Sequence, residues 1–150
     1  MTSRPDSLEL PGDLAAPHLA GILGDGQSAL AALLRHDGAA VSGCDIGGRR
    51  GAEKQGTLRS LLGQLGIPVS DGHDPAHVAP GTTAVVFSNA MPAGHPELAA
   101  ARRAGLPVLR RHQALGRYAG ARDDRDRPAP RRVAQEQLQQ PERQLRGSGP

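Results

Sequence analysis

The chain carries at residues 18–30 the sequence His18-Leu19-Ala20-Gly21-Ile22-Leu23-Gly24-Asp25-Gly26-Gln27-Ser28-Ala29-Leu30. A short apolar run enters a glycine-rich turn and leaves as a helical pattern from about Gln27, which predicts a strand, a phosphate loop and a helix. Glycines let the backbone turn tightly and approach a ligand, and the first amides of a helix lack intrahelical partners. Together these features predict an anion-binding site.

The glycine spacing leaves two alternatives open. The dinucleotide fingerprint G-x-G-x-x-G requires glycines at positions 21, 23 and 26, and Leu23 interrupts it. The stretch therefore also fits a glycine-rich turn that binds no ligand, and the rest of the chain has to distinguish the two.

Length and composition bound the class of protein. The 150 residues allow one domain and a tail, and Phe87 and Tyr118 are the only aromatic residues, which predicts a thin aliphatic core. The net charge of +3 divides into +1 for residues 1–120 and +2 for residues 121–150. Clustered lysines with interleaved aromatics are absent, and the excess of arginine over lysine is typical of a GC-rich genome, so we expect no nucleic-acid partner.

Cys44 is the only cysteine, which excludes an intramolecular disulfide and a cysteine-rich metal site. We expect no metal centre and no catalytic residue in this chain. Residues 1–12 lack a basic start and a long apolar run, and no later segment reaches the length of a membrane span. These features predict a soluble cytoplasmic protein that does not bind membranes.

Apolar periodicity, glycines and prolines predict alternating elements along the chain. After the first strand we expect a helix over 27–36, a strand over 39–45, a helix over 57–65, a strand over 67–69, a strand over 82–88, a helix over 96–104, a strand over 106–109 and a helix over 111–118. This alternation predicts an α/β fold, a Rossmann-like open parallel sheet of about five strands with helices on both faces. Residues 1–16 are expected to form a flexible leader and residues 120–150 a disordered polar tail.

Polar residues follow several of the predicted strands. Asp45 ends the second strand nineteen residues beyond Gly26, where a βαβ nucleotide binder places an acid that bonds the ligand. His73 follows the third strand, and Ser88 and Asn89 follow the buried run at 84–87. Ligands of open α/β sheets bind at the carboxyl ends of the strands, so these residues are candidates for one site.

Residues 17–119 resemble the amino-terminal domain of the Mur ligases, most closely the UDP-N-acetylmuramate:L-alanine ligases. Residues 18–31 are similar to H-x-x-G-I-G-G-x-G-M-S-x-x-A, and residues 41–45 to V-S-G-S-D. Gly72-His73 is a further match, residues 85–91 are similar to V-V-x-S-S-A-I, residues 95–97 to N-P-E and residues 105–111 to G-I-P-V-x-x-R. The order and spacing of the motifs agree with those of the family, in addition to the residue types.

The resemblance implies that this domain holds the uridine diphosphate part of UDP-N-acetylmuramate. By position, the residues implied to cradle phosphate are Gly21, Gly24, Gly26 and Ser28. Asp45 is implied to face the uridine, and the pocket is completed by His73, Ser88, Asn89 and Ala90. Two departures predict weakened binding: Leu23 brings a bulky side chain toward the phosphates, and Asp25 adds a like charge beside an anion site.

The family follows this domain with an ATP-binding domain that opens on G-T-H-G-K-T, a motif that these 150 residues lack. ATP and magnesium are therefore expected only with that further domain, whether or not a partner protein supplies it, and the chain alone is not expected to ligate. The change of composition near Gly120 favours a truncated gene or a shifted reading frame. An NAD(P)- or flavin-binding Rossmann domain and a non-catalytic remnant stay open as alternatives.

Overall fold

The computed structural model describes residues 10–46, 52–88, 91 and 94–128, and five parallel strands form its single sheet. The strands are β1 (Pro17–Ala20), β2 (Ser42–Asp45), β3 (Val69–Asp71), β4 (Ala84–Phe87) and β5 (Val108–Arg110), in the spatial order β3-β2-β1-β4-β5. The helices are α1 (Asp25–His36), α2 (Ala52–Gln64), α3 (Pro96–Arg103) and α4 (Arg111–Asp126), with short 3-10 turns η1 (Gly12–Leu14) and η2 (Pro75–His77). The predicted α/β class with a five-stranded parallel sheet is confirmed.

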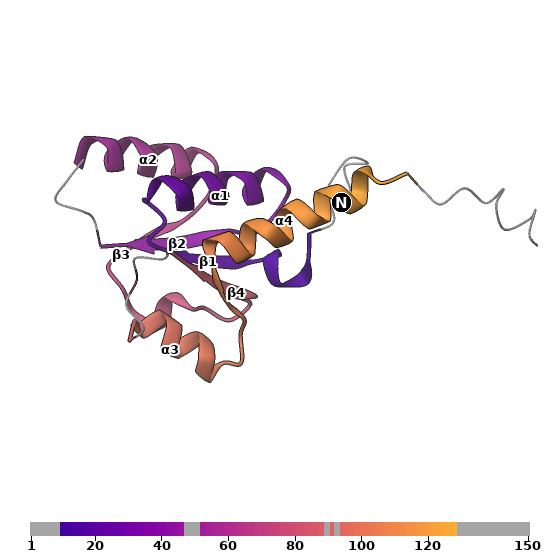
Figure 1. Ribbon diagram of the computed structural model, residues 1–150. Helices are drawn as coiled ribbons and strands as arrows, with labels where there is room; N and C mark the ends of the chain where they lie inside the picture. The colour runs from indigo at the N-terminus through magenta and orange to yellow at the C-terminus, as the bar shows by residue number, and fades with distance from the viewer. Residues whose placement is uncertain (1–9, 47–51, 89–90, 92–93, 129–150) are drawn as a thin grey trace, which may run out of the picture.

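The helices lie on both faces of the sheet, as predicted. Figure 1 shows α1, α2 and α4 on one face and α3 on the other. The two faces bury separate apolar clusters: Leu19 and Val86 pack with residues of α1, α2 and α4, whereas Val85 and Phe87 pack with Leu98 of α3. All four residues of β4 are buried, which confirms that its unbroken apolar run reflects burial on both faces.

The expectation of a flexible leader does not hold for residues 10–16. Leu14 in η1 is fully buried in the main core. The Thr83 hydroxyl donates to the Asp13 carbonyl at 2.9 Å and accepts from the Ala16 amide at 2.9 Å, and Arg117 of α4 forms an ion pair with Asp13. This segment is therefore part of the packed domain, because Leu14 is buried in the main core and Leu10 packs against it.

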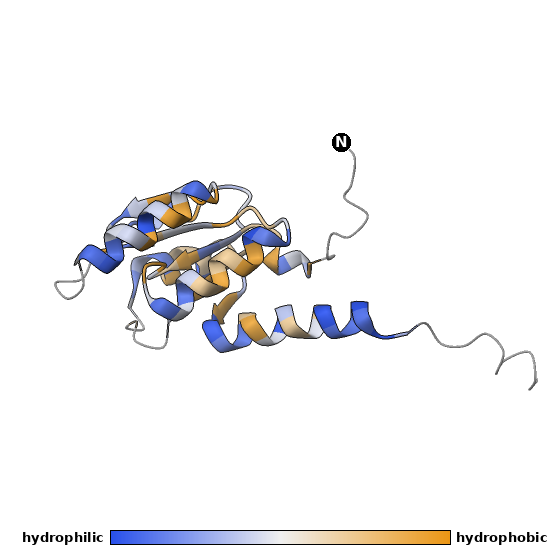
Figure 2. Ribbon diagram, turned by 90° about the horizontal axis from the view of Figure 1, so that it is seen from above, coloured by the Kyte–Doolittle hydropathy of each residue, from blue (hydrophilic) through white to orange (hydrophobic). Residues whose placement is uncertain are grey.

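The last helix is longer than the predicted 111–118, and the predicted disordered tail is wrong for residues 120–126. The Arg122 guanidinium lies over the Tyr118 ring and donates to its hydroxyl at 3.2 Å, and that hydroxyl donates to Asp37 at 2.5 Å. These contacts hold the first turn after Tyr118, the last buried residue, and the helix runs on to Asp126. Figure 2 shows that the far end of α4 is hydrophilic, which explains why apolar periodicity alone ended it early. Residues 129–150 lie outside the described residues.

Three further boundaries that differ from prediction are the starts of α2, β3 and β5. Thr57, expected to cap a helix, lies inside α2, where its hydroxyl donates to the Glu53 carbonyl at 3.0 Å. The predicted strands at 67–69 and 106–109 begin later, at Val69 and Val108, directly after prolines that lack the amide a ladder needs. Within the described residues, no helix is long and apolar enough to cross a membrane.

Candidate functional site

The glycine loop lies at the switch point of the sheet, between β1 and β4, where the order in which the chain adds strands reverses. β1 pairs with β4, yet the chain leaves β1 for α1 on one face and leaves β4 for α3 on the other. A crevice forms at the carboxyl ends of two such strands, and open α/β sheets bind ligands there. Gly21 follows β1 and Ser88 follows β4, and a Cβ added to Gly21 would lie 3.8 Å from Ser88 Oγ. The structure therefore brings these two predicted residues together.

The loop is a closed turn held to the end of β2. Gly21 has φ +74°, a left-handed conformation that favours glycine, and its carbonyl accepts the Gly24 amide at 3.1 Å. The amides of Gly21 and Ile22 both donate to the Cys44 carbonyl, at 2.9 and 3.1 Å. Gly24 is the N-cap of α1 and has no side chain to offer the first turn, which leaves those amides available to a ligand.

Asp45 reaches the same loop from the end of β2. Its Oδ2 accepts a hydrogen bond from the Leu23 amide at 3.0 Å. The acid predicted to face a ligand thus also fixes the loop that would hold the phosphates. Charge-assisted bonds of this kind are among the stronger hydrogen bonds in proteins.

Leu23, one of the two departures expected to weaken binding, is placed differently from prediction. Leu23 is 4% exposed and belongs to the main core, so the expectation that its side chain projects toward the phosphates is wrong. Positive φ occurs only at glycines among the described residues, so position 23 does not require glycine geometry either. The Asp25 carboxylate forms an exposed ion pair with Lys54 of α2 at 2.8 Å, which offsets its charge.

Arg111 brings a positive charge to the loop from the N-terminus of α4. A Cβ added to Gly26 would overlap the Arg111 guanidinium, whose Nε would lie 2.9 Å from it. The Arg111 guanidinium therefore packs against Gly26, in the space that a side chain at position 26 would occupy. Arg111 was not among the predicted site residues, although an arginine directly after the last strand of a parallel sheet was a signal for it.

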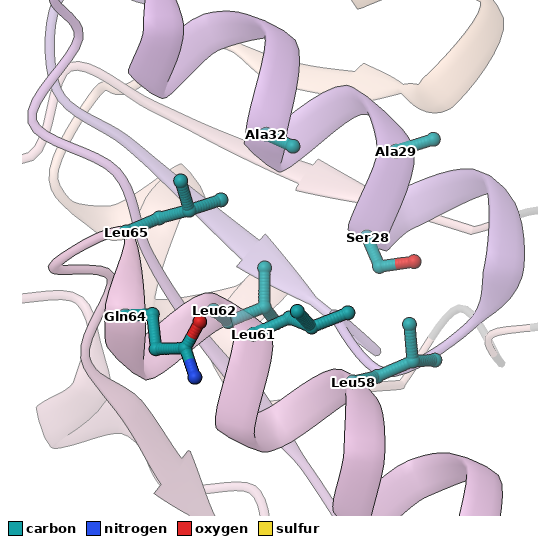
Figure 3. A pocket seen from close by; sticks show the side chains of 8 residues that line it. All are labelled: Ser28, Ala29, Ala32, Leu58, Leu61, Leu62, Gln64 and Leu65. Carbon is teal, nitrogen blue, oxygen red and sulfur yellow. The ribbon is translucent and has the colours of Figure 1, made fainter.

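Ser28 does not face the loop with its side chain. Its hydroxyl donates to the Asp25 carbonyl at 3.0 Å, and its amide already donates to the Gly24 carbonyl at 2.8 Å. The side chain lines an apolar groove of about 340 Å³ between α1 and α2, opposite Leu58 and Leu61 (Figure 3). The neighbouring Gln27 is buried under the loop, where its Nε2 donates to the Ala20 carbonyl at 2.9 Å and holds the end of β1.

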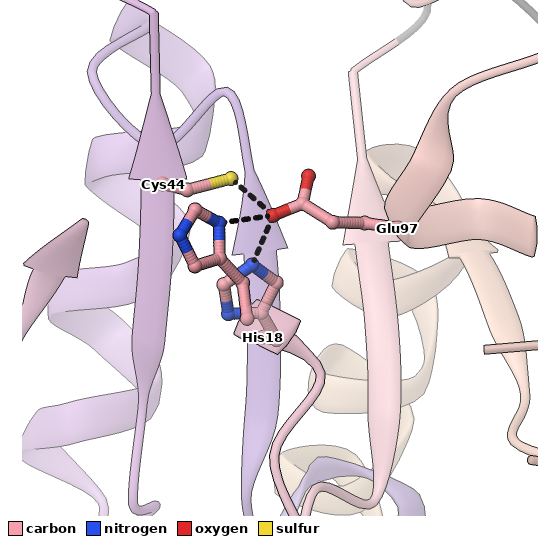
Figure 4. A group of neighbouring side chains, drawn as sticks. His18, Cys44 and Glu97 are labelled. Carbon is pink, nitrogen blue, oxygen red and sulfur yellow. Dashed lines mark hydrogen bonds and ion pairs between the residues drawn. The ribbon is translucent and has the colours of Figure 1, made fainter. Parts of the chain in front are cut away.

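His73 lies on the α3 face of the sheet, in a group that we call the Glu97 cluster. Its members are the buried carboxylate of Glu97 and the side chains around it: His18, Cys44, His73, His77 and His95. Glu97 Oε1 contacts Cys44 Sγ at 2.8 Å, His77 Nδ1 at 2.8 Å and His18 Nε2 at 3.1 Å (Figure 4). Oε2 faces the Nδ1 atoms of His73 and His95 at 3.2 and 3.3 Å.

Burial and hydrogen bonding set the ionisation of this cluster. Burial alone would raise the pKa of Glu97, but hydrogen bonds from His18, Cys44 and His77 outweigh it and hold the pKa at about 2. Burial, together with the Glu97 hydrogen bond, raises the pKa of the Cys44 thiol above its usual range. Burial also lowers the pKa of His95, with the neighbouring His73 adding to the effect.

Comparison with known proteins identifies the family. The family model described as "Mur ligase family, catalytic domain" matches residues 17–123, which is more than half of the chain. The chain belongs to the Mur ligase family. The resemblance inferred from the motifs is thereby confirmed.

Two curated relatives of this Mur ligase chain carry the same name. It is 44% identical over 94 residues to UDP-N-acetylmuramate--L-alanine ligase of Roseiflexus sp., covering 63% of this chain and 18% of the relative. It is 47% identical over 105 residues to the protein of the same name from Kineococcus radiotolerans, covering 68% of this chain and 21% of the relative. The chain thus spans about a fifth of the length of these relatives.

Solved structures agree in fold. A UDP-N-acetylmuramate:L-alanyl-gamma-D-glutamyl-meso-diaminopimelate ligase from Neisseria meningitides matches with a TM-score of 0.56 and 29% identity, over 67% of this chain and 30% of that one. A UDP-N-acetylmuramate-alanine ligase from Thermotoga maritima matches with a TM-score of 0.55 and 29% identity, over 67% and 21% of the two chains.

The predicted site residues of this Mur ligase chain fall into three places. The loop glycines, Asp45 and Ser88 lie at the carboxyl ends of β1, β2 and β4, whereas His73 belongs to the Glu97 cluster and Ser28 to the α1–α2 groove. Asn89 and Ala90 lie outside the described residues. The sequence analysis did not predict the Glu97 cluster. The cluster contains four of the six histidines of the chain, but their spacing in the sequence does not show that they lie together.

Proposed function

We propose that this domain binds the uridine diphosphate moiety of UDP-N-acetylmuramate, as the amino-terminal domain of a UDP-N-acetylmuramate:L-alanine ligase. One observation carries the proposal: the glycine loop, the α1 N-terminus, Asp45 and Arg111 converge on the crevice between β1 and β4. The names of the curated relatives support the choice of ligand. In those longer proteins the ligation of L-alanine is the stated activity, and we extend it to this chain as part of the same proposal.

The phosphate end of the ligand is assigned to the loop. The positive end of the α1 dipole and the uncapped amides after Gly24 attract an anion, and the Arg111 guanidinium adds a full positive charge that is suited to bidentate phosphate contacts. Lys54 offsets the carboxylate of Asp25, so the loop keeps a net attraction for phosphate. These groups account for affinity but not for the choice of base.

The uridine end is assigned to the side of the crevice toward β2. Asp45 offers a carboxylate there, and its bond to the Leu23 amide fixes its position before the ligand arrives. A fixed acceptor lowers the ordering cost of binding. We assign no ATP or magnesium ligand to these 150 residues, because the phosphate-loop lysine and its neighbouring hydroxyl are not found in the sequence.

Calorimetric titration of the full chain with UDP-N-acetylmuramate, UDP, NAD and ATP tests the proposal. We expect the two uridine nucleotides to bind and the two adenine nucleotides to bind much more weakly. Arg111→Gln is expected to lower the affinity for UDP at least tenfold, while Arg103→Gln, an exposed arginine of α3, serves as the matched control. Tighter binding of NAD would favour an oxidoreductase domain, and binding of none of the four would favour a non-binding remnant.

A further inference from the structure

The Glu97 cluster contains a complete set of metal-ligand atoms. His18 comes from β1, Cys44 from β2 and Glu97 from α3 (Figure 4), and His77 comes from η2, so four separate segments meet at one point. One ligand atom of each lies within 4.8 Å of the other three. His18, Cys44 and Glu97 are buried, and His77 is partly exposed, which leaves a path by which an ion can enter.

We propose that this group is a structural zinc site with the ligands His18 Nε2, Cys44 Sγ, His77 Nδ1 and Glu97 Oε1. Two imidazoles, one thiolate and one carboxylate are all ligands that Zn²⁺ takes, and four of them complete its tetrahedral shell. A soft thiolate together with imidazoles disfavours magnesium and calcium. The site is separate from the nucleotide crevice, and the proposal does not depend on the proposed function.

The distances are close to those of a zinc site. Zn–N and Zn–O bonds of about 2.0–2.1 Å and a Zn–S bond of about 2.3 Å place tetrahedral ligand atoms about 3.3–3.6 Å apart. The contacts of Glu97 Oε1 to the thiol and the two imidazoles measure 2.8–3.1 Å. A retreat of the carboxylate oxygen by about 0.5–1 Å therefore opens the centre for the ion, within the reach of a side-chain rotation.

The charges also balance. A fully buried carboxylate is costly unless a positive charge or several hydrogen bonds compensate it. Zn²⁺ with one carboxylate and one thiolate is neutral, and the thiol proton is released to solvent when the Zn–S bond forms. Glu97 Oε2 is buried without a hydrogen-bond partner among the described residues, although the Nδ1 atoms of His73 and His95 lie 3.2 and 3.3 Å from it.

The surroundings supply the outer contacts that such a site needs. When His18 binds through Nε2, its proton lies on Nδ1, which is 3.0 Å from Ser42 Oγ and can donate to it. His95 Nδ1 accepts the Glu97 amide at 3.3 Å, which holds this ring beside the carboxylate. The ion would join β1, β2, η2 and α3, and thereby stabilise the face of the sheet that α3 covers.

Metal titration of the full chain after treatment with a chelator tests the proposal. We expect Zn²⁺ to bind at one equivalent per chain and to raise the melting temperature. Co²⁺, used as a spectroscopic probe, is expected to give a thiolate-to-cobalt charge-transfer band and the intense visible bands of tetrahedral cobalt. Cys44 is the only cysteine, so a thiolate band can arise from no other residue.

Cys44→Ser keeps a small hydroxyl donor beside Glu97 and is expected to abolish the charge-transfer band and to lower zinc affinity at least tenfold. His77→Gln, on a partly exposed turn, is expected to lower the affinity similarly and serves if Cys44→Ser does not fold. His36→Gln and His112→Gln are the matched controls, because both histidines are exposed and outside the cluster. The proposal is overturned if cobalt shows no thiolate band, or if zinc binds Cys44→Ser as well as it binds the original chain.

Discussion

The carboxylate of Asp45 accepts a hydrogen bond from the backbone amide of Leu23 at 3.0 Å, and so the end of β2 holds the glycine loop that follows β1. Asp45 therefore has two roles, and the sequence motif does not distinguish them. It fixes the loop in the free protein, and under the proposed function it also presents a charge to the uridine nucleotide. The two roles can be separated by substitution.

Asp45→Ala removes both the charge and the tether, whereas Asp45→Asn keeps an oxygen that can accept the Leu23 amide. We expect both variants to lose roughly 1.5–3 kcal/mol of UDP binding, the range for hydrogen bonds to charged groups. Only Asp45→Ala should also lose about 1 kcal/mol of folding stability. Calorimetry measures the UDP affinity, and urea melts measure the folding stability. Unchanged affinity in both folded variants would remove Asp45 from the site.

Glu97 predicts a specific dependence of stability on pH. Its folded-state pKa of about 2 lies below the ordinary value of 4.5, so the stability it contributes is complete above pH 4.5 and is lost as pH falls toward 2. With a chelator present, the original chain should lose more stability between pH 5 and pH 3 than Glu97→Gln does. Glu53→Gln, at an exposed position on α2, is the control. Parallel losses in Glu97→Gln and the original chain would show that this carboxylate is not specially stabilised.

Local patterns predicted the order of strands and helices and therefore the fold, because each element carries its own apolar period and is bounded by glycine or proline. Leu23 was misplaced because a motif shows that position 23 lies in the loop but not which way its side chain points. After the left-handed turn at Gly21, the chain returns that side chain to the core. Packing decides which way a loop side chain points, and the spacing of the motif residues does not encode that direction.

The Glu97 cluster was beyond prediction for a different reason. His18 and Glu97 are 79 positions apart, and the parallel crossovers alone bring β1, β2 and α3 together. The sequence did contain one indirect sign. Cys44 and His95 stand where the V-S-G-S-D and N-P-E motifs have serine and asparagine, so both departures introduce metal-ligand atoms at positions that turned out to face Glu97.

Gly43 in β2 is required by close packing. A Cβ there would lie 2.7 Å from Ile22 Cβ and 2.8 Å from the Leu19 carbonyl, both of which belong to the loop and its strand. Gly43→Ala should therefore cost about 1–3 kcal/mol of stability. Gly63→Ala in α2, where an added Cβ meets nothing within 4 Å, should instead stabilise by about 0.4–1 kcal/mol. Denaturant melts compare the pair, and equal effects of the two substitutions would contradict the packing at Gly43.

Leu23 provides the sharpest test of how the loop is built. If its side chain pointed at the phosphates, Leu23→Gly would clear the site and tighten UDP binding at little cost. The structure instead buries it at 4% exposure in the core beneath the loop. Emptying such a position costs about 2–5 kcal/mol for Leu→Ala, and glycine adds backbone freedom to the unfolded chain. We therefore expect Leu23→Gly to be strongly destabilised without any gain in UDP affinity. Leu23→Met, which conserves volume, should cost less than about 1.5 kcal/mol and bind UDP as the original chain does. Tighter UDP binding by Leu23→Gly with a nearly unchanged urea midpoint would place the leucine in the nucleotide site after all.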